Sequence, residues 1–131
     1  MQPDQIFTRP VLDELFPAER TNEFFDALFG DADEGSYTIQ LEYDSYDPAT
    51  QTLRFLLDLH QRPGCCLVCN LTYGLPEVFK RHPIINIAGL VKDVEQRLGN
   101  GWTCGDWSLG STLQHNQERH SIPLTIHLNE P

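Results

Sequence analysis

Three closely spaced cysteines, Cys65, Cys66 and Cys69, most resemble a reactive centre. Cys66 and Cys69 have the C-x-x-C spacing of zinc and thiol redox sites. The sequence predicts a strand over 65–73, however, and residues three apart in a strand point to opposite faces. Cys65 and Cys69 share a face, but at strand geometry about 13 Å separates them, too far for a disulfide. We therefore interpret these thiols and Cys104 as structural, and expect no metal or cofactor.

Histidines and acidic residues give the next candidates. His115 and His120 flank a predicted turn at 116–119, where two histidines could share a metal. No third ligand accompanies them, so we interpret them as solvated turn residues. Four polar residues could converge on one sheet face, although nothing in their spacing requires it: Asp58, His60, Asp106 and His115.

Two further functional motifs are not matched by the sequence. The acidic segment 31–35, with Glu42 further on, resembles a calcium loop, but Gly35 falls one place early for an EF-hand. A charged, solvated turn is our interpretation. The G-x-S-x-G context of a hydrolase nucleophile is absent around Ser36, Ser108 and Ser111. We therefore expect no catalytic residue.

The elements that must position these side chains begin with helices. Pro10 and Pro17 each stand at a predicted helix start, giving helices over 10–16 and 17–29. The clearest helix covers 84–98, where apolar residues recur on one stripe: Ile87, Leu90, Val91, Val94 and Leu98. Residues 1–9 precede these helices, and we expect them to form a flexible arm.

Strands follow from alternation of apolar and polar residues. The segments 37–43, 53–59 and 65–73 alternate strictly and are joined by short turns, which predicts an antiparallel meander. A hairpin of 102–114 and 121–128 comes after the third helix. Gly105 and Gly110 predict a bulge or bend in its first strand. Pro123 cannot donate to a ladder and therefore predicts an edge position for the second.

This order of elements predicts a single α+β domain over 1–131: a five-stranded, mainly antiparallel sheet with helices on one face. The opposite sheet face mixes polar and apolar residues, which is typical of a surface partly covered by a partner or a second copy of the chain; the N-terminal helices could provide the cover instead. Trp102 and Trp107 are five apart, so a regular strand would expose one of them. The candidate partner-binding residues are Leu56, Val68 and Trp107.

The order of helix, three strands, helix and two strands over 18–128 is similar to that of the type III secretion chaperone-like fold. Members of that fold are small, acidic and commonly dimeric, so the resemblance implies a chaperone-like role. They usually end in a third helix, whereas this chain ends Leu128-Asn129-Glu130-Pro131.

The negative charge is regional. Between Asp13 and Asp47 stand eleven acidic residues and one base, Arg20, and the remaining eight acids and eight bases balance, so this stretch accounts for the net charge of −10. A field of one sign repels nucleic acid and favours basic partners.

Composition and charge together exclude several classes of protein. No apolar run approaches the length of a membrane span. With no secretory signal in the first residues, we expect a cytoplasmic location. The sequence predicts a non-catalytic protein-binding or chaperone-like module that binds a protein partner or forms a homodimer. The alternative is a small enzyme or small-molecule-binding domain with a pocket between sheet and helices, built from Tyr43, His60, Tyr73, Cys104 and Trp107.

Overall fold

The computed structural model describes residues 2–29, 37–61, 79–116 and 118–131. Its helices and strands follow one another in separate groups, which makes it an α+β protein, as the sequence predicts. In chain order they are α1 (Pro3–Ile6), α2 (Arg9–Leu15), α3 (Ala18–Phe29), β1 (Tyr37–Asp47), β2 (Thr52–Gln61), α6 (Ile87–Leu98), β3 (Thr103–Leu109), β4 (Leu113–Gln114) and β5 (Arg119–Asn129).

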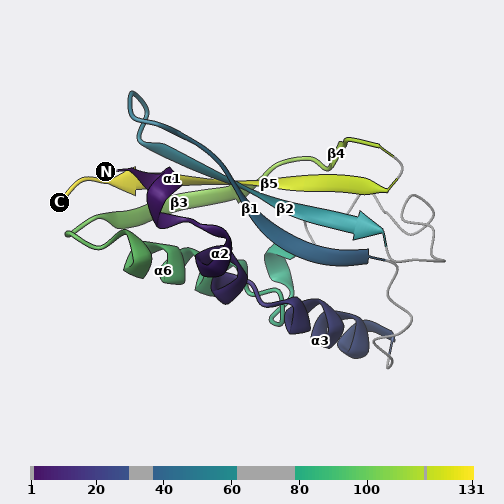
Figure 1. Cartoon of the computed structure of the whole chain (residues 1–131). Helices are drawn as coiled ribbons and strands as arrows, with labels where there is room; N and C mark the ends of the chain where they lie inside the picture. Colours follow the sequence, from purple (N-terminus) through teal and green to yellow (C-terminus); the bar gives the residue numbers. More distant parts are fainter. Residues whose placement is uncertain (1, 30–36, 62–78, 117) are drawn as a thin grey trace.

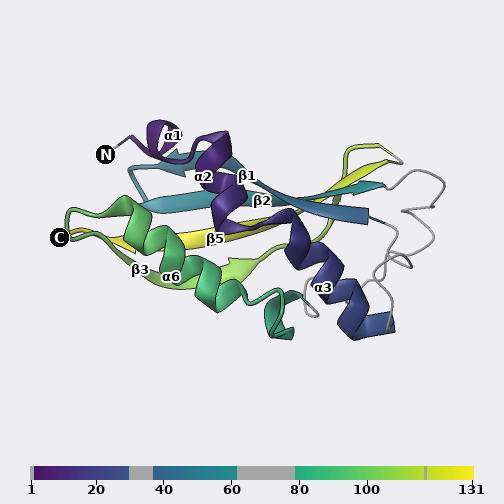
Figure 2. The ribbon, with the colours of Figure 1, turned by 60° about the horizontal axis from the view of Figure 1, so that its bottom comes forward.

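The five strands form one antiparallel sheet in the order β1-β2-β5-β3, and β4 pairs with β5 beyond the end of β3. Helices α2, α3 and α6 lie against one face of this sheet (Figure 1). The view from the helix side shows the same layers, with the helices in front of the strands (Figure 2). The predicted sheet with helices on one face is thus confirmed.

The core lies between these two layers. Alternate residues of β2 point toward the helices and are fully buried: Leu53, Phe55, Leu57 and Leu59. Their neighbours in the adjoining strands continue the same apolar layer, since Leu57 pairs with Leu41 of β1 on one side and with Ile122 of β5 on the other. The apolar stripe of α6 packs against this layer from the helix side. Burial of this continuous surface is the main stabilising term of the fold.

Helix α6 begins at Ile87, three residues later than the sequence predicts. Asn86 has a left-handed backbone (φ 50°), which a helix interior does not tolerate. Its side chain accepts a hydrogen bond from the backbone N–H of Gly89 and so caps the helix.

The second edge of β2 is occupied by β5. The two strands pair from Thr52 to His60, while β1 pairs along the other edge. The predicted meander assigns that edge of β2 to residues 65–73, which lie outside the described residues. In the described sheet the strand beside β2 therefore comes from the end of the chain.

Pro123 does not mark an edge strand, because β5 lies between β2 and β3. The carbonyl of Pro123 accepts a hydrogen bond from the N–H of Gly110, so its backbone faces the gap between β3 and β4. The ladder is interrupted at that point, and the N–H that proline lacks is not needed there. The bend predicted at Gly110 is confirmed, as is the irregularity near Gly105, where the register shifts between Cys104 and Trp107.

The segment expected to be a flexible arm contains α1 and contributes to the core. Phe7 is 3% exposed, and its ring lies 4.9 Å from the ring of Phe55, edge to face. Arg9 begins α2 and bonds to β1.

Within the described residues, the helices are too short or too polar to cross a membrane.

Candidate binding groove

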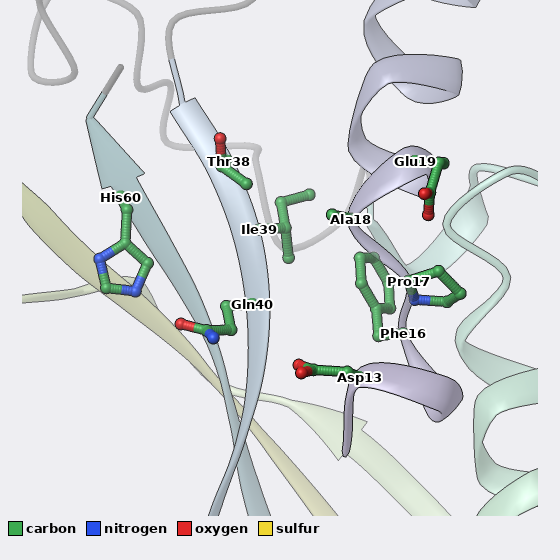
Figure 3. A pocket seen from close by; sticks show the side chains of 9 residues that line it. All are labelled: Asp13, Phe16, Pro17, Ala18, Glu19, Thr38, Ile39, Gln40 and His60. Carbon is green, nitrogen blue, oxygen red and sulfur yellow. The ribbon is translucent and has the colours of Figure 1, made fainter. Parts of the chain in front are cut away.

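A groove of about 550 Å³ runs between the α2–α3 segment and the edge strand β1 (Figure 3). Its helical side comes from residues 13–19. On the strand side Ile39 points toward the helices, and the groove extends past the β1 edge to Thr38, Gln40 and His60 on the opposite face of the sheet. The lining residues are Asp13, Phe16, Pro17, Ala18, Glu19, Thr38, Ile39, Gln40 and His60. Apolar side chains lie at its centre and carboxylates lie on the helical side.

The break between α2 and α3 shapes this groove. The backbone N–H of Phe16 donates to the Leu12 carbonyl and ends α2, and Pro17 then starts the next helical turn, where Arg20 N–H donates to its carbonyl. The Phe16 ring is turned into the core and is 2% exposed. The Arg20 guanidinium covers the ring at 4.9 Å from its centroid, a cation–π contact.

Side chains from the helical segment occupy the open edge of β1. The Thr21 hydroxyl, fully buried, accepts a hydrogen bond of 3.1 Å from the Ile39 N–H. The Arg9 guanidinium donates to the Leu41 carbonyl at 2.5 Å. Because these two backbone groups already have partners, a strand cannot add to this part of the edge. The groove must therefore be recognised through its side chains.

Charge on the helical side of the groove is negative. Arg9 contacts two carboxylates at once, Asp13 at 3.0 Å and Glu42 at 2.6 Å. Glu19 has no ion pair with any residue of the described chain. Glu23 follows one turn later on α3, where the two carboxylates reinforce each other's field.

A polar cluster lies on the sheet face opposite the helices. The Asp58 carboxylate, 1% exposed, accepts hydrogen bonds from Ser121 Oγ at 2.5 Å and from Arg119 Nη2 at 2.8 Å. Ser121 Oγ also lies 2.7 Å from His115 Nε2. His60 Nε2 is 3.9 Å from the Asp58 carboxylate, beyond hydrogen-bond distance. The structure thus brings three of the four polar candidates together, while the fourth, Asp106, lies at an exposed position in the irregular part of β3.

This cluster resembles a catalytic triad in composition only. The Ser121 hydroxyl donates its proton to Asp58, so the nearby His115 nitrogen must be the donor in their contact. Ser121 is fully buried and out of reach of a substrate. The contacts hold β4 and the start of β5 to β2, which is a structural role.

His120 is buried, and the expectation that it is a solvated turn residue is wrong. It is 4% exposed on the helix side of β5, opposite Leu59. Burial lowers the pKa of His120, and the nearby His115 lowers it further. Within the described residues, no group of three or more His, Cys, Asp and Glu side chains is placed to hold a metal ion. Cys65, Cys66 and Cys69 lie outside those residues.

The residues predicted to bind a partner are not gathered at one place. Leu56 is half-buried on the sheet face opposite the helices, paired with Glu42 and Pro123. Trp107 lies on the helix side of β3, half-buried against the core. Trp102 is likewise half-buried there, so neither tryptophan is fully exposed. Val68 lies outside the described residues.

The residues of the predicted enzyme pocket are also dispersed. Tyr43 lies on β1 and Cys104 on β3, with β2 and β5 between them, a spacing of about 14 Å at the strand separation of a sheet. His60 faces the opposite side, and Tyr73 lies outside the described residues. Burial, with a smaller contribution from Glu95, raises the pKa of the Cys104 thiol to about 11, so the thiol is protonated and unreactive at neutral pH.

No protein-family model, curated protein or solved structure matches this chain. The resemblance in element order to the type III secretion chaperone-like fold therefore gains no support from comparison.

Proposed function

We propose that this chain is a non-catalytic, cytoplasmic protein-binding module that accepts a polypeptide segment of its partner in the groove between α2–α3 and β1. The groove itself is the observation that carries the proposal. Apolar side chains line its centre and carboxylates line its helical side, a combination that is typical of surfaces that bind a segment reversibly. A second copy of the chain would count as such a partner, giving a homodimer.

The dispersal of reactive side chains supports a binding role over catalysis. A catalytic site needs a nucleophile, a base and a charge-stabilising group within contact of one substrate. Ser121 and Asp58 of the described polar cluster are buried, so a substrate could not reach the hydroxyl, and the described cysteine is protonated at neutral pH.

A small-molecule site is the second candidate function. The volume of the groove falls within the range of ligand pockets. Because one side of the groove is open and no set of polar groups converges at its centre, an extended segment fits it better than an enclosed small molecule (Figure 3).

Selection from a display library of random 12-residue peptides tests the proposed function. Ala18 is exposed at the start of α3 and lines the groove, so Ala18→Trp should fill the groove without touching the core. We expect peptides that bind the natural protein and lose at least tenfold in affinity for Ala18→Trp, whose fold is checked by circular dichroism. Recovery of no such peptide would reject a polypeptide-binding groove.

A further inference from the structure

We infer that the segment bound in the groove is cationic, with lysine or arginine residues flanking a single apolar anchor. This inference rests on the proposed function and specifies the chemistry of the partner. It depends on three properties of the groove, namely its apolar centre, the sign of its charge and the capped edge of β1.

The apolar centre is small. Pro17 and Ala18 present apolar surface at the break between the two helices, and the buried side chains of Phe16 and Ile39 support them from behind. Figure 3 shows these four residues between the β1 backbone and the first turn of α3. A surface of this size accommodates one apolar side chain of the partner rather than an amphipathic helix, which presents several in a row.

The charge around this centre is net negative, because the carboxylates of Asp13, Glu19 and Glu42 outnumber Arg9 and the Arg20 guanidinium that lies over the Phe16 ring. Of the nine described lining residues, none is lysine or arginine, whereas Asp13 and Glu19 are acidic. Arg9 contacts both Asp13 and Glu42, and its single positive charge offsets only one of these two carboxylates. Glu19 has no basic partner within the described chain, and its charge is left to attract a cation.

Charge is important for recognition because the backbone groups at the edge of β1 are already hydrogen-bonded. Peptides that bind by strand addition gain affinity from the backbone whatever their sequence. Here Thr21 and Arg9 already occupy the Ile39 N–H and the Leu41 carbonyl. The partner must therefore be selected by side-chain chemistry, for which complementary charge sets both specificity and association rate.

The test uses the tightest peptide recovered from the display library, synthesised with its basic residues and again with each replaced by glutamine. Affinities are measured by fluorescence anisotropy for the natural protein and for Glu19→Lys. A matched control is Glu118→Lys, the same change of charge at an exposed position before β5 that does not line the groove. Glu19→Gln separates loss of the carboxylate from repulsion by the new lysine.

We expect Glu19→Lys to weaken the basic peptide about tenfold and Glu19→Gln about threefold, with Glu118→Lys nearly unchanged. Raising NaCl from 50 to 500 mM should weaken binding to the natural protein, because the attraction is screened. The glutamine peptide should bind more weakly and without this salt dependence.

Other outcomes separate the inference from the function on which it rests. Peptides that bind in an Ala18-dependent manner but are uncharged or acidic would overturn the inference and leave the binding function standing. The same conclusion follows if Glu19→Lys and Glu118→Lys weaken the basic peptide equally, because a local contact would then be lacking. Failure to recover any groove-dependent peptide would overturn both.

Discussion

Asp58 carries a charge that is almost fully removed from water, on a sheet face that no described helix covers (Figure 1). An isolated buried carboxylate would be strongly destabilising. Here Arg119 donates through both Nε and Nη2 to one carboxylate oxygen, and Ser121 donates to the other. The side chain is therefore stable only while these donors stay in place, and it ties the last strand to β2.

Replacing Asp58 by asparagine should destabilise the protein. The amide cannot accept from both donors, and the guanidinium of Arg119 loses its counter-charge. Because Arg119 is 40% exposed and water can replace part of this contact, we expect a loss of about 2–3 kcal/mol in the free energy of unfolding, measured by urea titration. The control is Glu118→Gln, an exposed acid beside Arg119, and a similar loss in both variants would contradict this role for Asp58.

His120 should make stability depend on pH. Its pKa is lowered in the folded chain from the ordinary value of 6.5, so the unfolded chain binds a proton more readily. The stabilisation is therefore present above pH 6.5 and is lost as the pH falls through the lower folded pKa. Titration of this one group contributes at most about 1.4 kcal/mol per pH unit. Urea titrations between pH 5 and 7.5 should show that His120→Gln lowers this slope.

The matched control for His120 is His127→Gln, which removes an exposed histidine from the same strand. An equal change of slope in the two variants would show that the buried position of His120 is not the cause.

Among the elements, the junction of β3 and β4 with β5 depends on one glycine. A Cβ atom at Gly110 would lie 2.8 Å from Cγ of Pro123, closer than carbon atoms approach. The proline ring is rigid and cannot turn aside. We expect Gly110→Ala to cost about 1–3 kcal/mol of unfolding free energy, measured by urea titration.

Gly105→Ala is the control for this prediction. Its new methyl group would meet the mobile side-chain amide of Asn129 at 3.1 Å and should therefore cost less. Equal losses in the two variants would mean that any side chain in this irregular strand is destabilising, and that close packing on Pro123 is not the reason.

The sequence predicts elements well where their signal is local. Alternation in 37–43 and 53–59 and the stripe of 84–98 correspond to β1, β2 and α6. Which strands pair with each other has no local signal. β2 and β5 are more than 50 residues apart, and neither sequence indicates that the two strands are neighbours. The edge position predicted from Pro123 was wrong for the same reason. Proline is tolerated in β5 because the neighbouring strand is interrupted at Gly110, and nothing in the β5 sequence shows that interruption.

The same limit applies to the candidate site. Asp58 and Ser121 are 63 residues apart and meet only through the pairing of β2 with β5. For the groove, a signal was present in part: Pro17 restarts a helix directly after Phe16, which requires a break at that point. That this break faces an edge strand follows only from the tertiary packing of α2 and α3 on β1.

At the scale of the whole molecule, the acidic segment is partly neutralised by basic residues from elsewhere in the chain. Arg54 pairs with Asp44, Arg97 with Glu14, and Arg9 with two carboxylates. These contacts are largely exposed and each contributes little to stability. The net charge of −10 remains, and repulsion among like charges opposes the compact state.

Salt should therefore stabilise this protein. Between 10 and 200 mM NaCl both the repulsion and the surface ion pairs are screened. Because the unbalanced charges outnumber the pairs, we expect a net gain of about 1 kcal/mol, or roughly 3–5 °C in Tm by circular dichroism. The double variant Glu19→Gln/Glu23→Gln, two charges less negative, should gain less from the same salt. A Tm that falls as NaCl is added would mean that the ion pairs dominate, and that the acidic segment is balanced within the fold rather than directed outward at a partner.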